Sequence, residues 1–156
     1  MSHATAEILA AAIKFLAARA PDQIQAAALA DTLISKIEAA DVVIITAPMY
    51  NFSVPSTLKA RIDHVARARR TFHYTSDGPK GLLLSKKVFV ASTRDEFYSD
   101  GPAKIMDFHE TYLRAGLGFT RLQDITFIHT ENLARGDDSV KFAQDDALTQ
   151  IHALGA

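Results

Sequence analysis

The chain has 156 residues, of which 48% are apolar, and its 17 basic and 18 acidic side chains give a net charge of -1. This length and composition are typical of one globular domain with a sizeable core, and the near-neutral charge argues against a nucleic-acid partner. Because the sequence contains no cysteine, disulfides, thiolate catalysis and zinc–thiolate sites are excluded.

The first forty residues are predicted to be helical. Residues 4–19 are rich in alanine and place apolar side chains at helical spacing, and a second apolar stripe runs over residues 29–37 after a Pro-Asp break. Lys14 and Arg19 interrupt the first stretch. We therefore expect neither a signal peptide nor a membrane span, and we expect a cytoplasmic protein.

The first predicted strand covers residues 42–46 and runs into a turn, residues 47–52, that combines Pro, Met, Tyr, Asn and Phe. A continuously apolar strand of this kind is typical of burial on both faces in a parallel sheet. Ligands of open α/β sheets bind beyond the carboxyl ends of the strands. Backbone N–H groups, an amide and aromatic surface at that place can hold a flat heterocycle with a polar edge. The alternative is an ordinary strand-to-helix loop whose aromatic side chains fill the core.

Helices and strands alternate in the rest of the chain. The patterns predict a helix over residues 55–68, a hairpin within 71–84, a strand over 87–91, a helix from 102 to about 116, a strand over 124–129 and a closing helix over 138–154. Strands separated by helices indicate right-handed, parallel βαβ connections. The predicted fold class is α/β, a three-layer α/β/α sandwich.

A set of short motifs resembles the FMN-dependent NADH-azoreductase and quinone-reductase family, whose fold is flavodoxin-like. These motifs are PMYNF at residues 48–52, LK at 58–59, VAR at 65–67, TF at 71–72 and GP at 78–79, together with Asp63 and Tyr74. The resemblance runs from about residue 33 to residue 136. It implies a single flavodoxin-like domain over residues 1–156, with a helical N-terminal part at 1–40 and an azoreductase-like core at 41–156.

The resemblance also implies an activity and a site. A nicotinamide, NADH or NADPH, would pass hydride through FMN to an azo or quinone acceptor, with the flavin at the interface of a homodimer. Tyr74 would lie over the ring, near a small aromatic or quinone-like substrate. The residues implied to contact the cofactor are Pro48, Met49, Tyr50, Asn51, Phe52, Thr93 and Arg94.

The sequence departs from the family pattern in three places that affect this site, one of which is Gly116, where the family often has an aromatic residue that covers the substrate. The chain begins beyond the family's first β-α-β segment, which carries the phosphate-binding loop, so we expect an N-terminally truncated parallel sheet. Residues 42–46 would then form a sheet edge that pairs with a partner strand, most economically in a homodimer, or that the N-terminal helices cover. The loop at residues 93–96 reads Thr-Arg-Asp-Glu where the family reads Ser-Arg-Gly-Gly, so two carboxylates would lie beside the ring.

These departures leave two other functions open. Asp95 and Glu96 could perform acid–base chemistry in a cofactor-free enzyme that acts on a small aromatic substrate, although a solvated loop is the alternative. Arg94 could bind an anion or pair with Asp95 or Glu96 at the surface, and we expect the surface pair. The third possibility is a non-catalytic partner subunit.

The six histidines show no ligand spacing, so we expect no metal, and we expect no membrane partner.

Overall fold

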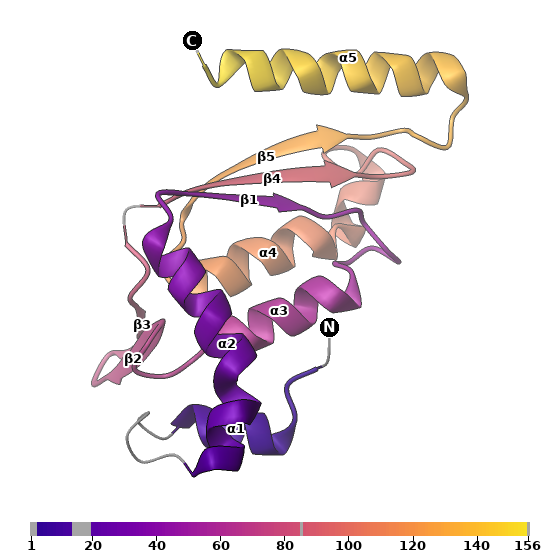
Figure 1. The fold of residues 1–156 in the computed structure, drawn as a ribbon. Coiled ribbons are helices and arrows are strands. Elements are labelled where there is room, and N and C mark those ends of the chain that lie inside the picture. The colour runs from indigo at the N-terminus through magenta and orange to yellow at the C-terminus, as the bar shows by residue number, and fades with distance from the viewer. Residues whose placement is uncertain (1–2, 14–19, 85, 156) are drawn as a thin grey trace.

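The computed structural model describes residues 3–13, 20–84 and 86–155 as a parallel sheet with helices on both faces (Figure 1). In chain order the elements are α1 (Ala6–Ile13), α2 (Pro21–Ala39), β1 (Val42–Thr46), α3 (Ser56–Val65), β2 (Phe72–Thr75), β3 (Gly78–Gly81), β4 (Lys87–Thr93), the 3-10 helix η2 (Pro102–Met106), α4 (Phe108–Phe119), β5 (Asp124–Thr130) and α5 (Asp137–Ala153).

The main sheet has the strand order β1-β4-β5, and both strand pairs are parallel. Ile44 of β1 lies opposite Phe89 of β4, which lies opposite Thr126 of β5. Helices α3 and α4 cover one face and α5 lies on the other (Figure 1). The predicted α/β class and the parallel βαβ arrangement are therefore confirmed.

The core lies between the sheet and the layer of α3 and α4. Val88 and Val90 of β4 contribute fully buried side chains, and their β1 neighbours Val43 and Ile45 pack on the same cluster. The other buried members of the core are Leu83, which follows the β2–β3 hairpin, Leu113 and Leu117 of α4, and Leu122 in the loop after α4. The alternation along each strand therefore sends one set of side chains into this layer and the other set toward α5.

Strand β1 differs from the prediction of burial on both faces. Val42 is 47% exposed and Ile44 is 72% exposed, because α5 packs against β5 and leaves the same face of β1 uncovered. Among the described residues β1 pairs only with β4, so the expected sheet edge is present. In the described part of the chain α1 packs on α2 and α2 packs on α3, and neither helix runs along the outer edge of β1 (Figure 1), so the alternative expectation of a helical cover is wrong.

Several element boundaries were predicted closely and others were not. The hairpin exists as the antiparallel pair β2–β3. The helix predicted over residues 102–116 divides into η2 and α4, because Asp107 accepts the backbone N–H of Glu110 and starts a new helix. Residues 14–19 of the first predicted helix lie outside the described residues. None of the helices in the described part of the chain is long and apolar enough to cross a membrane.

Candidate functional site

The turn after β1 is held at the carboxyl edge of the sheet by main-chain bonds. The N–H of Ala47 donates to the carbonyl of Ala91, and the N–H of Met49 donates to the carbonyl of Thr93, each at 2.9 Å. Tyr50 and Ser53 then exchange two backbone hydrogen bonds of 2.9 and 3.0 Å. These bonds fix the turn beside the end of β4.

Asn51 and Phe52 occupy the tip of this turn with positive φ angles of 46° and 69°. Asparagine tolerates this left-handed region, whereas phenylalanine seldom adopts it. The side chains are also exposed: Tyr50 to 62% and Phe52 to 41%. The alternative in which the aromatic side chains fill the core is therefore wrong. An unusual backbone that presents aromatic surface to solvent is a feature of ligand-binding turns.

The neighbouring loop, residues 93–99, contributes an aromatic contact and two carboxylates. The ring of Tyr98 meets that of Phe52 edge-on, with centroids 6.1 Å apart. Thr93 and Asp95 are exposed. Glu96 forms an ion pair with Arg135, with 2.5 Å between Oε2 and Nη2. The two adjacent carboxylates thus differ, because one is paired and the other faces solvent.

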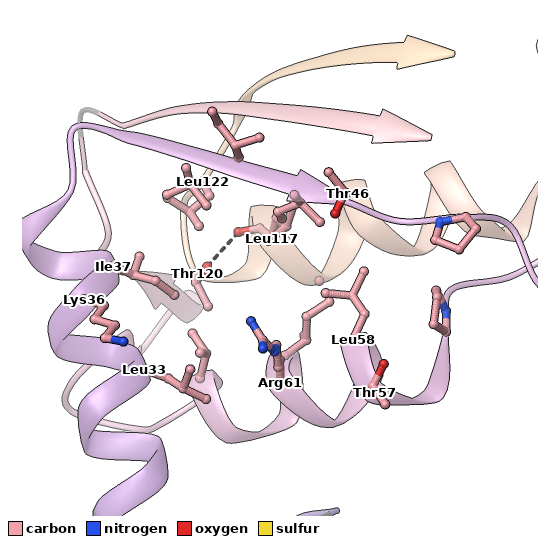
Figure 2. Close-up of a pocket in the computed structure, with 18 of the residues that line it drawn as sticks. Leu33, Lys36, Ile37, Thr46, Thr57, Leu58, Arg61, Leu117, Thr120 and Leu122 are labelled. Carbon is pink, nitrogen blue, oxygen red and sulfur yellow. Dashed lines mark hydrogen bonds between the residues drawn. The ribbon is translucent and has the colours of Figure 1, made fainter. Parts of the chain in front are cut away.

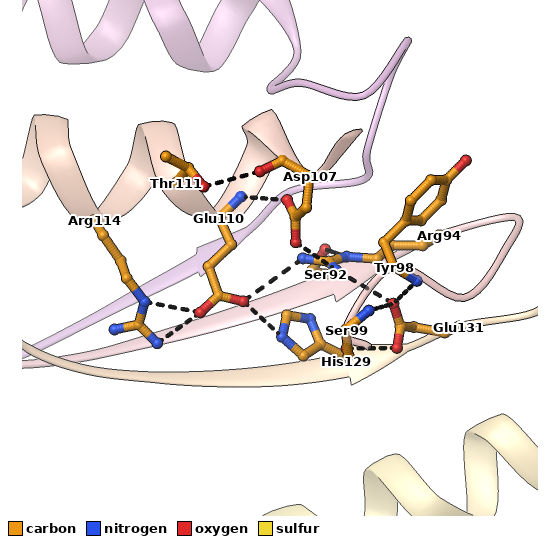
Figure 3. Close-up of polar contacts among 10 residues, drawn as sticks. All are labelled: Ser92, Arg94, Tyr98, Ser99, Asp107, Glu110, Thr111, Arg114, His129 and Glu131. Carbon is orange, nitrogen blue, oxygen red and sulfur yellow. Dashed lines mark hydrogen bonds and ion pairs between the residues drawn. The ribbon is translucent and has the colours of Figure 1, made fainter. Parts of the chain in front are cut away.

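Arg94 does not form the expected surface pair with Asp95 or Glu96. Its side chain is fully buried, and Nη1 lies 2.9 Å from Oδ2 of Asp107 and 3.2 Å from Oε1 of Glu131 (Figure 3). The main chain of Arg94 is engaged as well, since its N–H donates to the carbonyl of residue 130 and its carbonyl accepts from residue 133. Arg94 therefore holds the loop from within, so the expected surface pair is wrong, and the guanidinium is bound to carboxylates of this chain.

The two carboxylates around Arg94 connect three elements. Glu131, just after β5, accepts the N–H groups of Tyr98 at 2.8 Å and Ser99 at 3.1 Å, and the Ser99 hydroxyl at 2.5 Å. Asp107 starts α4. The guanidinium thus ties the 93–99 loop to β5 and α4 (Figure 3). Sequence reasoning missed this cluster, although the Asp-x-x-Glu spacing of residues 107 and 110 is a known helix-start pattern.

Two further titratable groups lie behind the site. The hydrogen bond from His129, followed by that from Arg114, lowers the pKa of Glu110 to about 2, although partial burial acts in the opposite direction. Burial, followed by the positive charge of Arg94, lowers the pKa of His109, and the negative charge of Asp107 and then the Ala47 backbone act in the opposite direction. His109 is fully buried, so a neutral imidazole lies under the start of the turn.

One predicted site residue lies apart from the others. Tyr74 belongs to β2, is 72% exposed and meets Phe72 edge-on at 5.5 Å. The β2–β3 hairpin and the 47–53 turn lie at opposite ends of α3 (Figure 1). A single chain therefore brings Pro48, the tip of the turn and the 93–99 loop together, and it leaves Tyr74 elsewhere. Within the residues described, no group of three His, Asp or Glu side chains is arranged to hold a metal ion.

Comparisons with known proteins agree with this architecture. A family model described as "Flavodoxin-like fold" matches residues 1–154. The chain is 50% identical over 136 residues to an FMN-dependent NADH:quinone oxidoreductase of Herminiimonas arsenicoxydans, covering 87% of this chain and 67% of the relative. It is 51% identical over 126 residues to one of Ralstonia nicotianae, covering 81% of this chain and 59% of the relative.

Solved structures give the same picture. The crystal structure of azoreductase AzrA matches with a TM-score of 0.87 at 25% identity, over 96% of this chain and 73% of that one. An azoreductase from Bacillus anthracis matches with a TM-score of 0.86 at the same identity and coverage. The chain therefore spans about three fifths to two thirds of the length of the two curated relatives, and about three quarters of the solved ones.

Proposed function

Because the chain belongs to the flavodoxin-like family of FMN-dependent NADH:quinone oxidoreductases and azoreductases, we propose that it passes hydride from NADH through FMN to a quinone or azo acceptor. The observation that carries this proposal is the exposed Tyr50–Asn51–Phe52 tip at the carboxyl edge of the sheet. In an open α/β sheet this edge is where ligands bind.

The residues present fit the ring portion of FMN. Tyr50 and Phe52 offer aromatic surface that is not used in the core, and Asn51 offers an amide with donor and acceptor groups. Pro48 and Met49 would contribute main chain and side chain at the base of the turn, and Thr93 would close it from the neighbouring loop. The phosphate needs donors at a helix N-terminus, and the described residues before Asp41 place none beside this turn.

FMN, when bound, supplies the hydride-accepting and hydride-donating ring. Asn51 would orient the polar edge of that ring, while Tyr50 and Phe52 would cover it and exclude water. Asp95 is the carboxylate available for proton transfer, since Glu96 is paired with Arg135. Its charge opposes negative charge on a neighbouring ligand.

Three finer points belong to the same proposal. Tyr74 would reach the ring from a second copy of the chain, because its own hairpin lies away from its own turn; this requires a homodimer. The acceptor would be small and aromatic or quinone-like, and NADPH is the alternative donor. The single domain over residues 1–156 and the cytoplasmic location remain predictions.

The test is a titration of FMN followed by flavin fluorescence. Asn51→Gly removes the amide and keeps the positive φ angle, so affinity should fall about three- to tenfold, which corresponds to one lost hydrogen bond. Asn132→Gly is the matched control, because Asn132 also has a positive φ of 63° and lies outside the turn. Purified protein with FMN should also oxidise NADH when a benzoquinone is added. Equal affinity in all three proteins would remove this turn from the site, and no flavin binding would refute the proposed activity.

A further inference from the structure

Tyr98 lies between the 93–99 loop and the tip of the turn. Its ring meets that of Phe52 edge-on, with centroids 6.1 Å apart and an angle of 76° between the ring planes. The side chain is half-buried, and its hydroxyl points away from the ion cluster around Arg94 (Figure 3). No other residue of the described chain is seen to bond this hydroxyl. Because a tyrosine with a buried ring usually finds a partner for its O–H, this group is available to a ligand.

Tyr98 also lines a cavity of about 320 Å³ next to η2. The apolar side chains of Phe97 and Met106 contribute to its wall, and its charged residues include the ion pair of Glu96 with Arg135. This volume is at the lower end of the range for pockets that hold small molecules. One ring therefore contacts the tip of the turn and borders a space that can take an aromatic group.

This cavity is distinct from the larger groove between β1 and α3 (Figure 2). That groove, of about 760 Å³, reaches the turn at Pro48 and Tyr50, and neither Tyr98 nor η2 contributes to its lining. Tyr98 instead follows β4 in the chain, beyond the carboxyl end of that strand. Because ligands of open α/β sheets bind beyond these strand ends, the ring of Tyr98 lies where contact with a ligand is expected.

A single carboxylate fixes the main chain of Tyr98. Oε1 of Glu131 accepts the N–H of Tyr98 at 2.8 Å and that of Ser99 at 3.1 Å, and Oε2 accepts the Ser99 hydroxyl at 2.5 Å. Nη1 of Arg94 lies 3.2 Å from the same Oε1. Hydrogen bonds to an ionised group are shorter and stronger than those between neutral groups. Because two successive N–H groups are held in this way, the backbone from which the Tyr98 ring projects is fixed relative to the end of β5.

We propose that Tyr98 is a further ligand-contacting residue of this site and that Glu131 is the residue that positions it. The ring of Tyr98 packs beside the flavin next to Phe52, and its hydroxyl donates a hydrogen bond to the flavin. Glu131 does not touch the flavin and acts only through the main chain of Tyr98 and the Ser99 segment. This inference rests on the proposed flavin function.

The contact is tested by fluorine NMR of the full chain labelled with fluorotyrosine. The four tyrosines, Tyr50, Tyr74, Tyr98 and Tyr112, give four resonances that single Tyr→Phe variants assign. The ring current of added FMN shifts the resonances of groups beside the flavin. We expect the Tyr50 and Tyr98 resonances to move in parallel with flavin fluorescence, and the Tyr112 resonance, from the middle of α4, to stay in place.

Two results would refute this assignment in different ways. A Tyr50 resonance that moves while the Tyr98 resonance stays in place would overturn this inference and leave the proposed function intact. No flavin binding at all would overturn both. Tyr98→Phe keeps the ring and removes the hydroxyl, so it should lower the affinity for FMN about three- to tenfold, as expected for one lost hydrogen bond. Unchanged affinity of this variant would exclude the hydroxyl contact.

The positioning role is tested by a double-mutant cycle on FMN affinity. Glu131→Gln keeps the size of the side chain and removes its charge, so it should lower the affinity about three- to tenfold. In a Tyr98→Leu background the same substitution should change the affinity less than about twofold, because the ring that Glu131 positions is then absent. Glu38→Gln is the control, since this carboxylate of α2 also accepts two hydrogen bonds, from Arg70, and its variant should bind FMN as wild type does.

Equal effects of Glu131→Gln in both backgrounds would show that Glu131 does not act through Tyr98. If Glu131→Gln does not fold, Ser99→Ala takes its place in the cycle, because it removes only the 2.5 Å hydroxyl bond to Glu131. In the Glu131 or Ser99 variant the Tyr98 resonance of the free protein should shift or broaden while the Tyr112 resonance stays unchanged. A general loss of structure would instead move both resonances, and this result would also overturn the positioning role.

Discussion

Replacing Arg94 by Met tests whether the buried ion cluster holds the loop at the site. The substitution keeps an apolar side chain in the cavity and removes the guanidinium. Asp107 and Glu131, only 10% and 9% exposed, then lose the cation that lies 2.9 and 3.2 Å away. Leaving buried charges without a partner typically costs about 3–5 kcal/mol, and we expect the free energy of unfolding to fall by that amount.

Urea denaturation followed by circular dichroism measures the effect. Arg114→Met is the control, because this arginine is 51% exposed and pairs with Glu110 one turn away on the same helix. Such a pair contributes about 0.3–0.5 kcal/mol. Arg114 also lies over the ring of Phe127 at 4.6 Å, so its variant measures what an exposed arginine of the same region contributes, and the loss for Arg94→Met should be several times larger.

A rescue experiment separates charge from packing. Adding Glu131→Gln to Arg94→Met removes one orphaned charge, so the double variant should regain about 1–2 kcal/mol of the loss, an interaction between contacting residues that a double-mutant cycle measures. A loss below about 1 kcal/mol for Arg94→Met, or no recovery in the double variant, would show that the cluster does not stabilise the loop.

Three other predictions concern pH and packing. The pKa of Glu110 lies at about 2, below its ordinary value of 4.5. The contribution of its carboxylate to the free energy of unfolding is therefore complete above pH 4.5 and is lost as the pH falls toward 2. Glu110→Gln should lower the free energy of unfolding by up to about 3 kcal/mol at neutral pH and should make stability less dependent on pH between about 2 and 4.5. Because the pKa of His109 is lowered from 6.5, the unfolded chain takes up a proton first and stability should decline as the pH falls below 6.5; His109→Gln should abolish that slope in urea titrations. A Cβ at Gly81 would lie 2.3 Å from the main chain at the end of α4, so Gly81→Ala should lower the free energy of unfolding by about 2 kcal/mol or more. The control is Gly118→Ala, where a Cβ has nothing within 4 Å, and this substitution should raise the free energy of unfolding by about 0.5–1 kcal/mol. Equal effects of the two substitutions would contradict the packing argument.

Periodicity and turn residues were sufficient to predict most of the fold. The apolar run at 42–46, the Asp-Gly-Pro turn within 71–84 and the alternation of strands with helices all appear where expected, because each depends on neighbours in the chain. The exposed tip of the 47–53 turn was one of two alternatives that the sequence left open, and the turn itself was predictable because asparagine in a polar turn has a local signature. Boundaries shifted where a side chain intervened, as at Asp107.

Long-range pairings could not be predicted in the same way. Arg94 has acidic neighbours in the sequence, yet its partners lie 13 and 37 residues away, because the carboxyl ends of β4 and β5 and the start of α4 converge at one edge. Tyr74 has the motif of a site residue but lies beyond α3 from the turn. Which polar groups meet depends on how the layers pack.

The amino-acid order alone indicated the kind of protein: strands separated by helices, which favour parallel pairing in the main sheet, a turn with aromatic and amide side chains after the first strand, and motifs that resemble those of its family. Packing in three dimensions settled what each charged group does. It buried Arg94, left Asp95 in solvent and brought Glu131 to the main chain of Tyr98 and Ser99. The physical reason is that secondary structure depends mainly on residues close in the sequence, whereas the free-energy cost of burying a charged group depends on all the groups packed around it.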